Sequence, residues 1–540
     1  MYRAGPWTGM RFSTPQASDI APYAELLYNV YVRDASSAAL VVGRPGFAKI
    51  GAGGGVGKQL GGVGVRTHQL IYQLTLQNGT EVSFLIVGGK LYTYSHGSDA
   101  FTESVTAANF TTASITLSTT ARCYAVTFNN KVVVSDGVNK PFLWDGTAGA
   151  GGLTSLTNAT VFFGQPWVRS ARLCAIDGTS TASRKSFVWS EVGDATIGYG
   201  TAPYTANIWD VVQTSNAIFF AGTGTNDAMV IARANSVTRI LGEIDTSWIS
   251  TSTKEGVHEY VGSLSPGGML VHQDSVYFFA NDGRIMRVRP GAPAQEIAIG
   301  VKEFIASYAV SKFAVVDALV WDAGSAGEYL IWGIAGTQPS NPNTFLIVDP
   351  LSGELVGVWT GWTQSRFGTW KDSNGNPVLV HGGGSTATAD ADGYTYIHGL
   401  TNGTTWSDGL NAGTQAVVHS VTTHAMGWDE TNDKYWDIAH VTVTVPSDLT
   451  DLGMQAKTPY GSGTSINAGS LTGSGDLWGS FLWGTGQWAS ISSERQIAAG
   501  IGTSGRWCQM TVSHATVGEQ FAVQSVACRA TDDTDSPMIA

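Results

Sequence analysis

The sequence predicts an all-β protein, in which a β-propeller is followed by a smaller β-sandwich domain and preceded by an N-terminal arm. The first observation behind this prediction is Gly268–Arg289 (GMLVHQDSVYFFANDGRIMRVR), three short apolar runs separated by turn formers, which is the pattern of a β-meander. The second is that similar strand clusters recur roughly every 40 to 50 residues over 64–400, the spacing of propeller blades. The third is a set of longer, alternating strands after 401, which suits a two-sheet sandwich.

The composition supports this class. Hydrophobic residues make up 43% of the 540 residues, and 18 Trp, 18 Tyr and 20 Phe can fill a large core, which argues against disorder. Charged residues reach only 13%, about half the usual share. The net charge of −12 disfavours a dedicated nucleic-acid reader, which needs a basic face for phosphates. An acidic surface still suits the wall of a passage to which DNA must not adhere.

Residues 1–63 are predicted to form an N-terminal arm and a linker. Leu26–Arg33 and Ala39–Val42 have the composition of strands, and Arg44-Pro45-Gly46-Phe47 that of a turn. The Gly-rich stretch that follows, GAGGGVGKQLGG, resembles a phosphate-binding loop. Its pattern fails at both ends, because Ala52 stands where Gly is needed and Gln59 where a hydroxyl is needed. We therefore expect a flexible link there.

Residues 64–400 are predicted to form the β-propeller. The segments expected to form its blades are Gly88–Tyr94, Asn129–Gly146, Ser186–Glu191, Ala228–Gly242, Gly268–Arg289, Tyr329–Glu354 and Val378–Ile397. They share a pattern but not residue identity, so the number of blades stays open between six and seven. Lys302–Phe313 is the one stretch that predicts a helix, because its apolar residues recur at helical spacing.

Residues 401–540 are predicted to form the β-sandwich, because apolar and polar residues alternate at 416–418, 438–445, 507–512 and 521–526. Trp478, Trp483 and Trp488 lie five residues apart within this domain. Exposed, they would stack on sugars. Buried, they would anchor a core, which their apolar neighbours favour.

The four cysteines Cys123, Cys174, Cys508 and Cys528 lie far apart, without a CxxC pair, so we expect buried free thiols and no structural zinc. Cys508 and Cys528 can pair only if their strands are neighbours, which stays open.

The search for catalytic, cofactor-binding and metal-binding residues finds none to assign. His381-Gly382-Gly383-Gly384 resembles the oxyanion sequence of some esterases, but no Gly-x-Ser-x-Gly elbow accompanies it. Asp282, Asp322 and Asp349 are candidate glycosidase carboxylates, yet each stands in a turn context where Asp is expected for structural reasons.

Two oxygen-rich stretches, Asp372–Asn376 and Asp390–Asp392, are candidate calcium ligands. The EF-hand pattern would need Glu at its twelfth position, which here is Gly383, so we expect turns. The N-terminus lacks the apolar region of a secretory signal, and no stretch is long enough to span a membrane. We therefore expect a protein that is made in a cytosol and stays soluble or joins a larger assembly.

Four motifs, in order along the chain, resemble one family. They are Leu27–Tyr31, Arg44–Phe47, Arg184–Asp194 with the form R-x-x-x-x-W-S-E-x-G-D, and Ser265–Gly268 leading to Val276–Gly283. Together they resemble the tail nozzle proteins, also called tail tubular or tail hub proteins, of short-tailed bacteriophages.

The resemblance implies a propeller-bearing homo-hexamer in the virion tail, assembled in the host bacterial cytoplasm below the adaptor. Its partners would be adaptor and portal-proximal tail proteins, tail fibres or spikes, and genomic DNA in transient contact as the ring retains and then conducts it. It implies no catalytic residue and no cofactor, and it leaves open the gating loop, the host, the receptor and the role of the C-terminal domain. Two alternatives remain: a receptor- or glycan-binding tail component that uses the Trp cluster, and a carbohydrate-active propeller enzyme.

Overall fold

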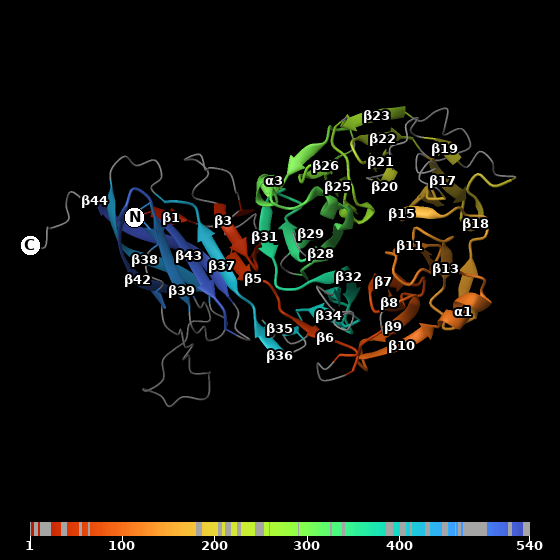
Figure 1. Ribbon diagram of the computed structural model, residues 1–540, viewed down its shortest axis with the longest axis horizontal. Helices are drawn as coiled ribbons and strands as arrows, with labels where there is room; N and C mark the ends of the chain where they lie inside the picture. Colours follow the sequence, from red (N-terminus) through yellow and green to blue (C-terminus); the bar gives the residue numbers. More distant parts are fainter. Residues whose placement is uncertain are drawn as a thin grey trace, which may run out of the picture.

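The protein is described by a computed structural model, in which a propeller and a sandwich lie side by side, with the N-terminal strands β3 (Tyr23–Tyr28) and β5 (Leu40–Gly43) on the side of the sandwich that faces the propeller (Figure 1). The described residues run from 2 to 532 with gaps. Residues outside the description are 1, 5–8, 11–22, 34–39, 53–56, 63–64, 180–185, 203–207, 211–217, 224–227, 243–252, 259, 290, 325–326, 337–340, 385–392, 400–406, 411–412, 427–432, 445–451, 460, 463–465, 468–493, 517–520 and 533–540.

Seven antiparallel sheets form the propeller within the described part of the chain. Blade 1 is β7 (His68–Thr75), β8 (Glu81–Val87), β9 (Lys90–Ser95) and β10 (Ala100–Val105). Blade 2 is β11 (Tyr124–Phe128), β12 (Lys131–Ser135), β13 (Phe142–Trp144) and β14 (Leu153–Ser155). Blade 3 is β15 (Phe162–Arg169), β16 (Arg172–Asp177), β17 (Ser186–Glu191), β18 (Asp194–Gly198) and β19 (Ile208–Asp210).

The remaining blades follow the same order. Blade 4 is β20 (Ile218–Thr223), β21 (Ala228–Arg233), β22 (Val237–Leu241) and β23 (Thr253–His258). Blade 5 is β24 (Met269–His272), β25 (Ser275–Phe279), β26 (Ile285–Val288) and β27 (Gln295–Ile297). Blade 6 is β28 (Asp317–Asp322), β29 (Glu328–Ile334), β30 (Thr344–Val348) and β31 (Leu355–Trp359). Blade 7 is β32 (Gln364–Lys371), β33 (Pro377–Gly383), β34 (Thr395–His398) and β6 (Phe47–Lys49).

The blades close into a ring. The first strands of the seven blades contact one another in turn, and β32 of blade 7 lies against β7 of blade 1. The number of blades, left open by the sequence, is therefore seven. The meander predicted at Gly268–Arg289 is confirmed as β24, β25 and β26. Gly283 in its second turn has φ +88°, a conformation that Gly adopts without a steric penalty.

The predicted helix over Lys302–Phe313 is wrong. A short helix α3 (Val301–Phe304) is followed by a 3-10 turn (Val310–Val315), and Ala309 between them is extended. The break lets the Tyr308 hydroxyl reach Thr344 Oγ1 at 3.1 Å while Phe313 packs on Phe279. Tertiary packing thus outweighs the helical periodicity. The sequence missed α1 (Ala107–Thr112), which begins with a capping box, and short 3-10 turns at Ala150–Gly152 and Pro266–Gly268.

Two sheets form the sandwich. The first contains β4 (Val30–Arg33), β5 (Leu40–Gly43), β44 (Ala522–Asp532), β38 (Lys434–Thr444) and β42 (Glu494–Gly505), with β1 (Tyr2–Ala4) on β44. The second contains β3 (Tyr23–Tyr28), β37 (His419–Thr423), β43 (Gln509–His514), β39 (Gly453–Thr458), β40 (Gly461–Ser462) and β41 (Ile466–Asn467). Through β3 and β2 (Gly9–Met10) this second sheet continues into blade 6, so one hydrogen-bonded sheet spans both domains.

The sheets do not follow the predicted boundaries at 63 and 400. The N-terminal segment runs between the domains, placing β4 and β5 in the sandwich and β6 in blade 7. β35 (Ser407–Leu410) and β36 (Gly413–Ala416) extend the sheet of blade 7. Edge strands come from distant parts of the sequence, and a local pattern does not reveal which edge a strand will join. Among the described residues, no helix is both long and apolar enough to cross a membrane.

Candidate functional site

Two adjoining cavities lie along the axis of the propeller, lined mainly by the innermost strands. Their volumes are about 320 Å³ and about 450 Å³, and both are lined by Gln165, Ala318 and Arg366. Asp317 is the only carboxylate among the described residues that line either cavity. Glycoside hydrolysis uses two carboxylates on either side of the bond, so these cavities do not provide that pair.

A buried ion pair stands in the wall of these cavities. Arg366 Nη1 donates to Asp317 Oδ1 at 2.7 Å, and both side chains are more than nine-tenths buried. Arg366 Nη2 also donates to the carbonyl oxygen of Cys123 at 2.8 Å, and the guanidinium lies 5.2 Å from the centre of the Tyr124 ring. The pair therefore ties blade 7 to blades 6 and 2 across the axis, and we interpret it as structural.

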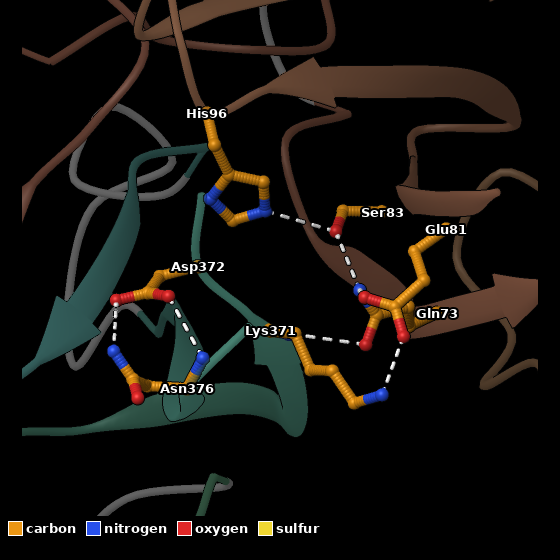
Figure 2. A network of polar contacts seen from close by, with 7 residues as sticks. All are labelled: Gln73, Glu81, Ser83, His96, Lys371, Asp372 and Asn376. Atoms are coloured by element: carbon orange, nitrogen blue, oxygen red, sulfur yellow. Dashed lines mark hydrogen bonds and ion pairs between the residues drawn. The ribbon is translucent and has the colours of Figure 1, made fainter. Parts of the chain in front are cut away.

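The seam where blade 7 meets blade 1 carries a polar network at its surface (Figure 2). Lys371, at the end of β32, forms an ion pair with Glu81 of β8, and its backbone N–H donates to Gln73 Oε1 at 3.0 Å. Gln73 Nε2 in turn donates to Ser83 Oγ, which lies 3.0 Å from His96 Nε2. We call this set the ring seam.

Next to the ring seam, an aromatic side chain of blade 7 packs against blade 1. The Trp370 ring stacks on Tyr94, with 5.3 Å between centroids and 20° between planes, and its Nε1 donates to the carbonyl oxygen of Tyr72 at 3.0 Å. Burial lowers the pKa of His96, while Asp372 and Glu81 oppose the shift. This half-buried imidazole therefore favours its neutral form.

A second joint connects the N-terminal segment, blade 6 and the sandwich. Arg44 is only 1% exposed. Its guanidinium lies 4.7 Å from the centre of the Trp362 ring, its Nε donates to Asn29 Oδ1 at 3.2 Å, and its Nη2 donates to the carbonyl oxygen of Thr360 at 3.3 Å. Asn29 Nδ2 donates to the carbonyl oxygen of Val418 at 3.0 Å. We call this set the interdomain junction.

The backbone is tightly packed next to this junction. Trp359 Nε1 donates to the carbonyl oxygen of Val30 at 3.2 Å. A Cβ atom at Gly357 would lie 2.2 Å from the same oxygen and 3.2 Å from Tyr31 Cα. Glycine is therefore required where the N-terminal strand β4 crosses the outer strand of blade 6.

Four buried histidines lie at or next to the interdomain junction, and three of them, His381, His398 and His419, interact with the charge of Arg44. His381 Nδ1 lies 2.7 Å from His398 Nε2, and His68 Nε2 lies 2.9 Å from Thr395 Oγ1. Burial lowers the pKa of His68 and that of His419 to about 3. Burial, followed by the neighbouring imidazoles and Arg44, holds the pKa of His381 well below the usual value, and burial with Arg44 does the same for His398. All four imidazoles are neutral at pH 7, which spares Arg44 the like charges of His381, His398 and His419.

The esterase-like sequence at 381–384 begins with His381, one of these buried histidines. His381, Gly382 and Gly383 are residues of β33, with His381 buried. A Cβ atom at Gly382 would lie 2.2 Å from His68 Cγ, so this glycine allows blades 7 and 1 to pack closely. The segment is a buried strand rather than an oxyanion loop.

The candidate carboxylates are turn residues, as predicted. Asp322 Oδ1 accepts from Gly324 N at 2.8 Å, and Asp349 Oδ1 accepts from Leu351 N at 2.9 Å. Asp282 accepts from Arg284 Nε at 2.7 Å. The three lie in different turns, and the structure does not bring them together.

Of the two candidate calcium-binding stretches, the structure describes only Asp372–Asn376. Asp372 accepts from Asn374 N at 2.8 Å and from Asn376 N at 2.9 Å, which confirms a turn. Asp390–Asp392, like Trp478, Trp483 and Trp488, lies outside the described residues. Within the described part, no group of three or more His, Cys, Asp or Glu could hold a metal ion.

Of the residues at these joints, Arg44 and Asn29 were recognised in the sequence only as parts of motifs, and Arg366 was not recognised at all. No signal in the sequence marks Arg366, because its partner Asp317 belongs to another blade. Arg44 carried one usable signal: a cation inside an apolar, turn-forming context between strands.

Comparison with known proteins finds only distant likenesses to solved structures. No family model matches the chain, and no curated protein matches it. The WD40 β-propeller domain of Doa1 is 12% identical with a TM-score of 0.38, covering 66% of this chain and 98% of that one. BamB from Moraxella catarrhalis is 10% identical with a TM-score of 0.36, covering 68% and 95%. At such identities the likeness concerns the propeller fold alone.

Proposed function

We propose that the chain is a structural subunit of the tail nozzle of a short-tailed bacteriophage. Six copies would form a ring in the virion tail, in contact with the adaptor and with tail fibres or spikes. The ring would retain the phage DNA and conduct it during ejection, without catalysis. The net charge of −12 suits a wall that DNA passes without adhering.

One observation carries this proposal: the N-terminal segment is woven into both domains. β4 and β5 lie in the sandwich, β6 completes blade 7, and one sheet runs from blade 6 into the sandwich. A wall segment must keep its domains at a fixed angle, because a ring closes only if each repeated heterologous contact has the same geometry. Shared strands and the buried interdomain junction provide that rigidity.

The test is the assembly state. The purified chain, alone or mixed with neighbouring tail proteins, should form six-fold rings in negative-stain electron micrographs. Six copies of the 56.9 kDa chain give a particle of about 340 kDa by light scattering. A monomer at every concentration that also fails to join tail particles would contradict the proposal.

Two variants sharpen this test. Gly357→Ala disturbs the crossing of β4 and blade 6, so we expect fewer closed rings. Gly97→Ala is the matched control, because a Cβ atom there meets nothing within 4 Å, and it should form rings like the parent chain. Turnover of a polysaccharide by the parent chain would instead favour the enzyme alternative.

A further inference from the structure

A strand of only three residues, β6 (Phe47–Lys49), belongs to the sheet of blade 7. It pairs with β34, and it meets β35 at a single position (Figure 1). Just after it, the backbone N–H of Ile50 donates to the carbonyl oxygen of Thr395 at 3.1 Å. So short a strand has few ladder hydrogen bonds of its own, and such elements open locally more easily than the core of a fold. The side chains packed against β6 therefore decide how firmly it is held.

Two buried imidazoles pack against this strand. The centre of the Phe47 ring lies 4.8 Å from that of His381 and 5.1 Å from that of His398. The imidazoles are 1% and 4% exposed, and His381 Nδ1 lies 2.7 Å from His398 Nε2. In a hydrogen bond between two imidazoles one nitrogen carries the proton and the other offers its lone pair. This bond therefore exists only while at least one of the two rings is neutral.

A permanent positive charge lies beside the pair. The guanidinium of Arg44 is 4.7 Å from the centre of the Trp362 ring, and that ring is 5.3 Å from the ring of His398. An Arg side chain stays protonated throughout the pH range in which a protein is folded. A positive charge added to His381 or His398 would therefore be both desolvated and repelled.

Titratable side chains of four neighbouring strands face the same cluster, and three of them are imidazoles. They are His68 of β7, Tyr396 of β34, His419 of β37 and His514 of β43. His419 Nε2 lies 2.7 Å from the position that a Cβ atom would take at Gly43, directly before Arg44. Lys49 points instead to the Tyr394 ring, 4.3 Å from its centre. The imidazoles become cations in acid, so acid adds positive charge to a cluster that is already positive.

We propose that β6 is an acid-released strand, which leaves blade 7 when His381 and His398 are both protonated. A first proton still leaves one lone pair between the two facing nitrogens. A second proton places an N–H group on each of them, so two donors and two positive charges oppose each other. Once β6 has left, water reaches both rings and they bind protons normally. The inference concerns the folded chain alone and does not depend on the proposed tail function.

The direction of the pH dependence follows from burial. With β6 in place, burial and the neighbouring charges hold the pKa of His381 and of His398 well below 6.5. With β6 released, the hydrated rings return to about 6.5. Below that pH the open form binds two protons that the closed form excludes, so the ratio of open to closed rises by up to about 100-fold per pH unit. The strand is held at neutral pH and is released in acid.

The experiment is hydrogen–deuterium exchange of the full-length chain at pH 7.5, 6.5, 5.5 and 4.5, with each rate corrected for the intrinsic exchange rate at that pH. Peptides that contain Ile50 report on β6, because its amide is bonded to Thr395 only while the strand is in place. Peptides from 124–135 in blade 2 contain no histidine and report on the rest of the propeller. We expect protection at Ile50 to approach a loss of about 100-fold per pH unit below pH 6.5, while 124–135 stays protected.

A pair of variants tests the assignment to the two imidazoles. His398→Gln keeps a side-chain amide next to His381 but cannot take up a proton, so the loss of protection should fall to about tenfold per pH unit. His272→Gln is the matched control, because it removes another buried imidazole, on β24 in blade 5, and should keep the full dependence. If His398→Gln does not fold, the comparison of Ile50 with 124–135 in the parent chain still decides.

Three results would overturn the inference. Protection at Ile50 that does not change down to pH 4.5 would mean that acid does not release β6. A parallel loss at Ile50 and at 124–135 would mean that acid unfolds the propeller as a whole. An undiminished pH dependence in His398→Gln would mean that other groups take up the protons.

Discussion

The interdomain junction and the ring seam both join segments that are far apart in the sequence, and they do so by opposite means. At the junction, Arg44 is 1% exposed and lies against the Trp362 ring. At the seam, the side chains of Lys371 and Glu81 are 49% and 24% exposed. A desolvated cation depends on every fixed partner, whereas water can replace a partner lost at the surface. We therefore expect the junction to be intolerant of substitution and the seam to be tolerant.

The largest effect should come from Arg44→Ala. The substitution removes the contact with Trp362, leaves a cavity and takes a donor from the carbonyl oxygen of Thr360. We expect the free energy of unfolding to fall by about 3–4 kcal/mol. Urea unfolding followed by tryptophan fluorescence measures it.

The control for this prediction is Arg33→Ala, because Arg33 lies exposed at the end of β4. Its removal should change the free energy of unfolding by less than about 0.5 kcal/mol. Equal effects at the two positions would show that burial does not distinguish them.

The second prediction concerns the backbone of the same region. Gly357→Ala forces a Cβ atom to within 2.2 Å of the carbonyl oxygen of Val30, so β4 and blade 6 must move apart. We expect a loss of roughly 2–3 kcal/mol in the free energy of unfolding. Gly97→Ala should be nearly neutral. Retention of full stability by Gly357→Ala would mean that the two strands are not held at this separation.

The difference between local contacts and contacts between distant segments also explains which features could be predicted from the sequence. The meander at Gly268–Arg289 was recognised because a blade is built from neighbouring strands whose apolar runs and turn residues are local. The turn roles of Asp322 and Asp349 followed in the same way, since an Asp side chain that bonds backbone N–H groups two residues on is a local device.

Contacts between segments that are distant in the sequence could not be predicted from such local patterns. Nothing near Phe47–Lys49 indicates that this short strand completes blade 7, more than 300 residues away in the sequence. The pairing of Arg366 with Asp317 likewise depends on the ring being closed. The helix predicted at Lys302–Phe313 failed for a related reason, because Tyr308 and Phe313 reach partners in blades 6 and 5 that periodicity does not reveal.

The third prediction is a dependence on pH that originates at His68, which is buried where blade 1 packs against blade 7. The folded-state pKa of His68 is about 3, against 6.5 in the unfolded chain. Between these values the unfolded chain binds a proton that the native protein excludes, so stability is lost as pH falls from 6.5 towards 3. Each such histidine contributes about 1.4 kcal/mol per pH unit in this window.

His68→Gln isolates this contribution, because the carboxylates titrate alike in both proteins. Urea unfolding at pH 6.5, 5.5 and 4.5 should show the variant gaining on the parent as pH falls. His96→Gln, at the half-buried imidazole of the ring seam, should gain less. Parallel curves for His68→Gln and the parent would contradict a depressed pKa at His68.

The smallest effect should come from Glu81→Gln at the ring seam, which removes the ion pair with Lys371. We expect a loss of roughly 0.5 kcal/mol in the free energy of unfolding at low salt, because exposed charges are well hydrated when apart. The loss should disappear in 1 M NaCl, where the screening length is about 3 Å. Trp370, stacked on Tyr94, holds blades 7 and 1 together without the pair. A salt-independent loss above about 2 kcal/mol would place the seam in the same class as the junction and remove the contrast between them.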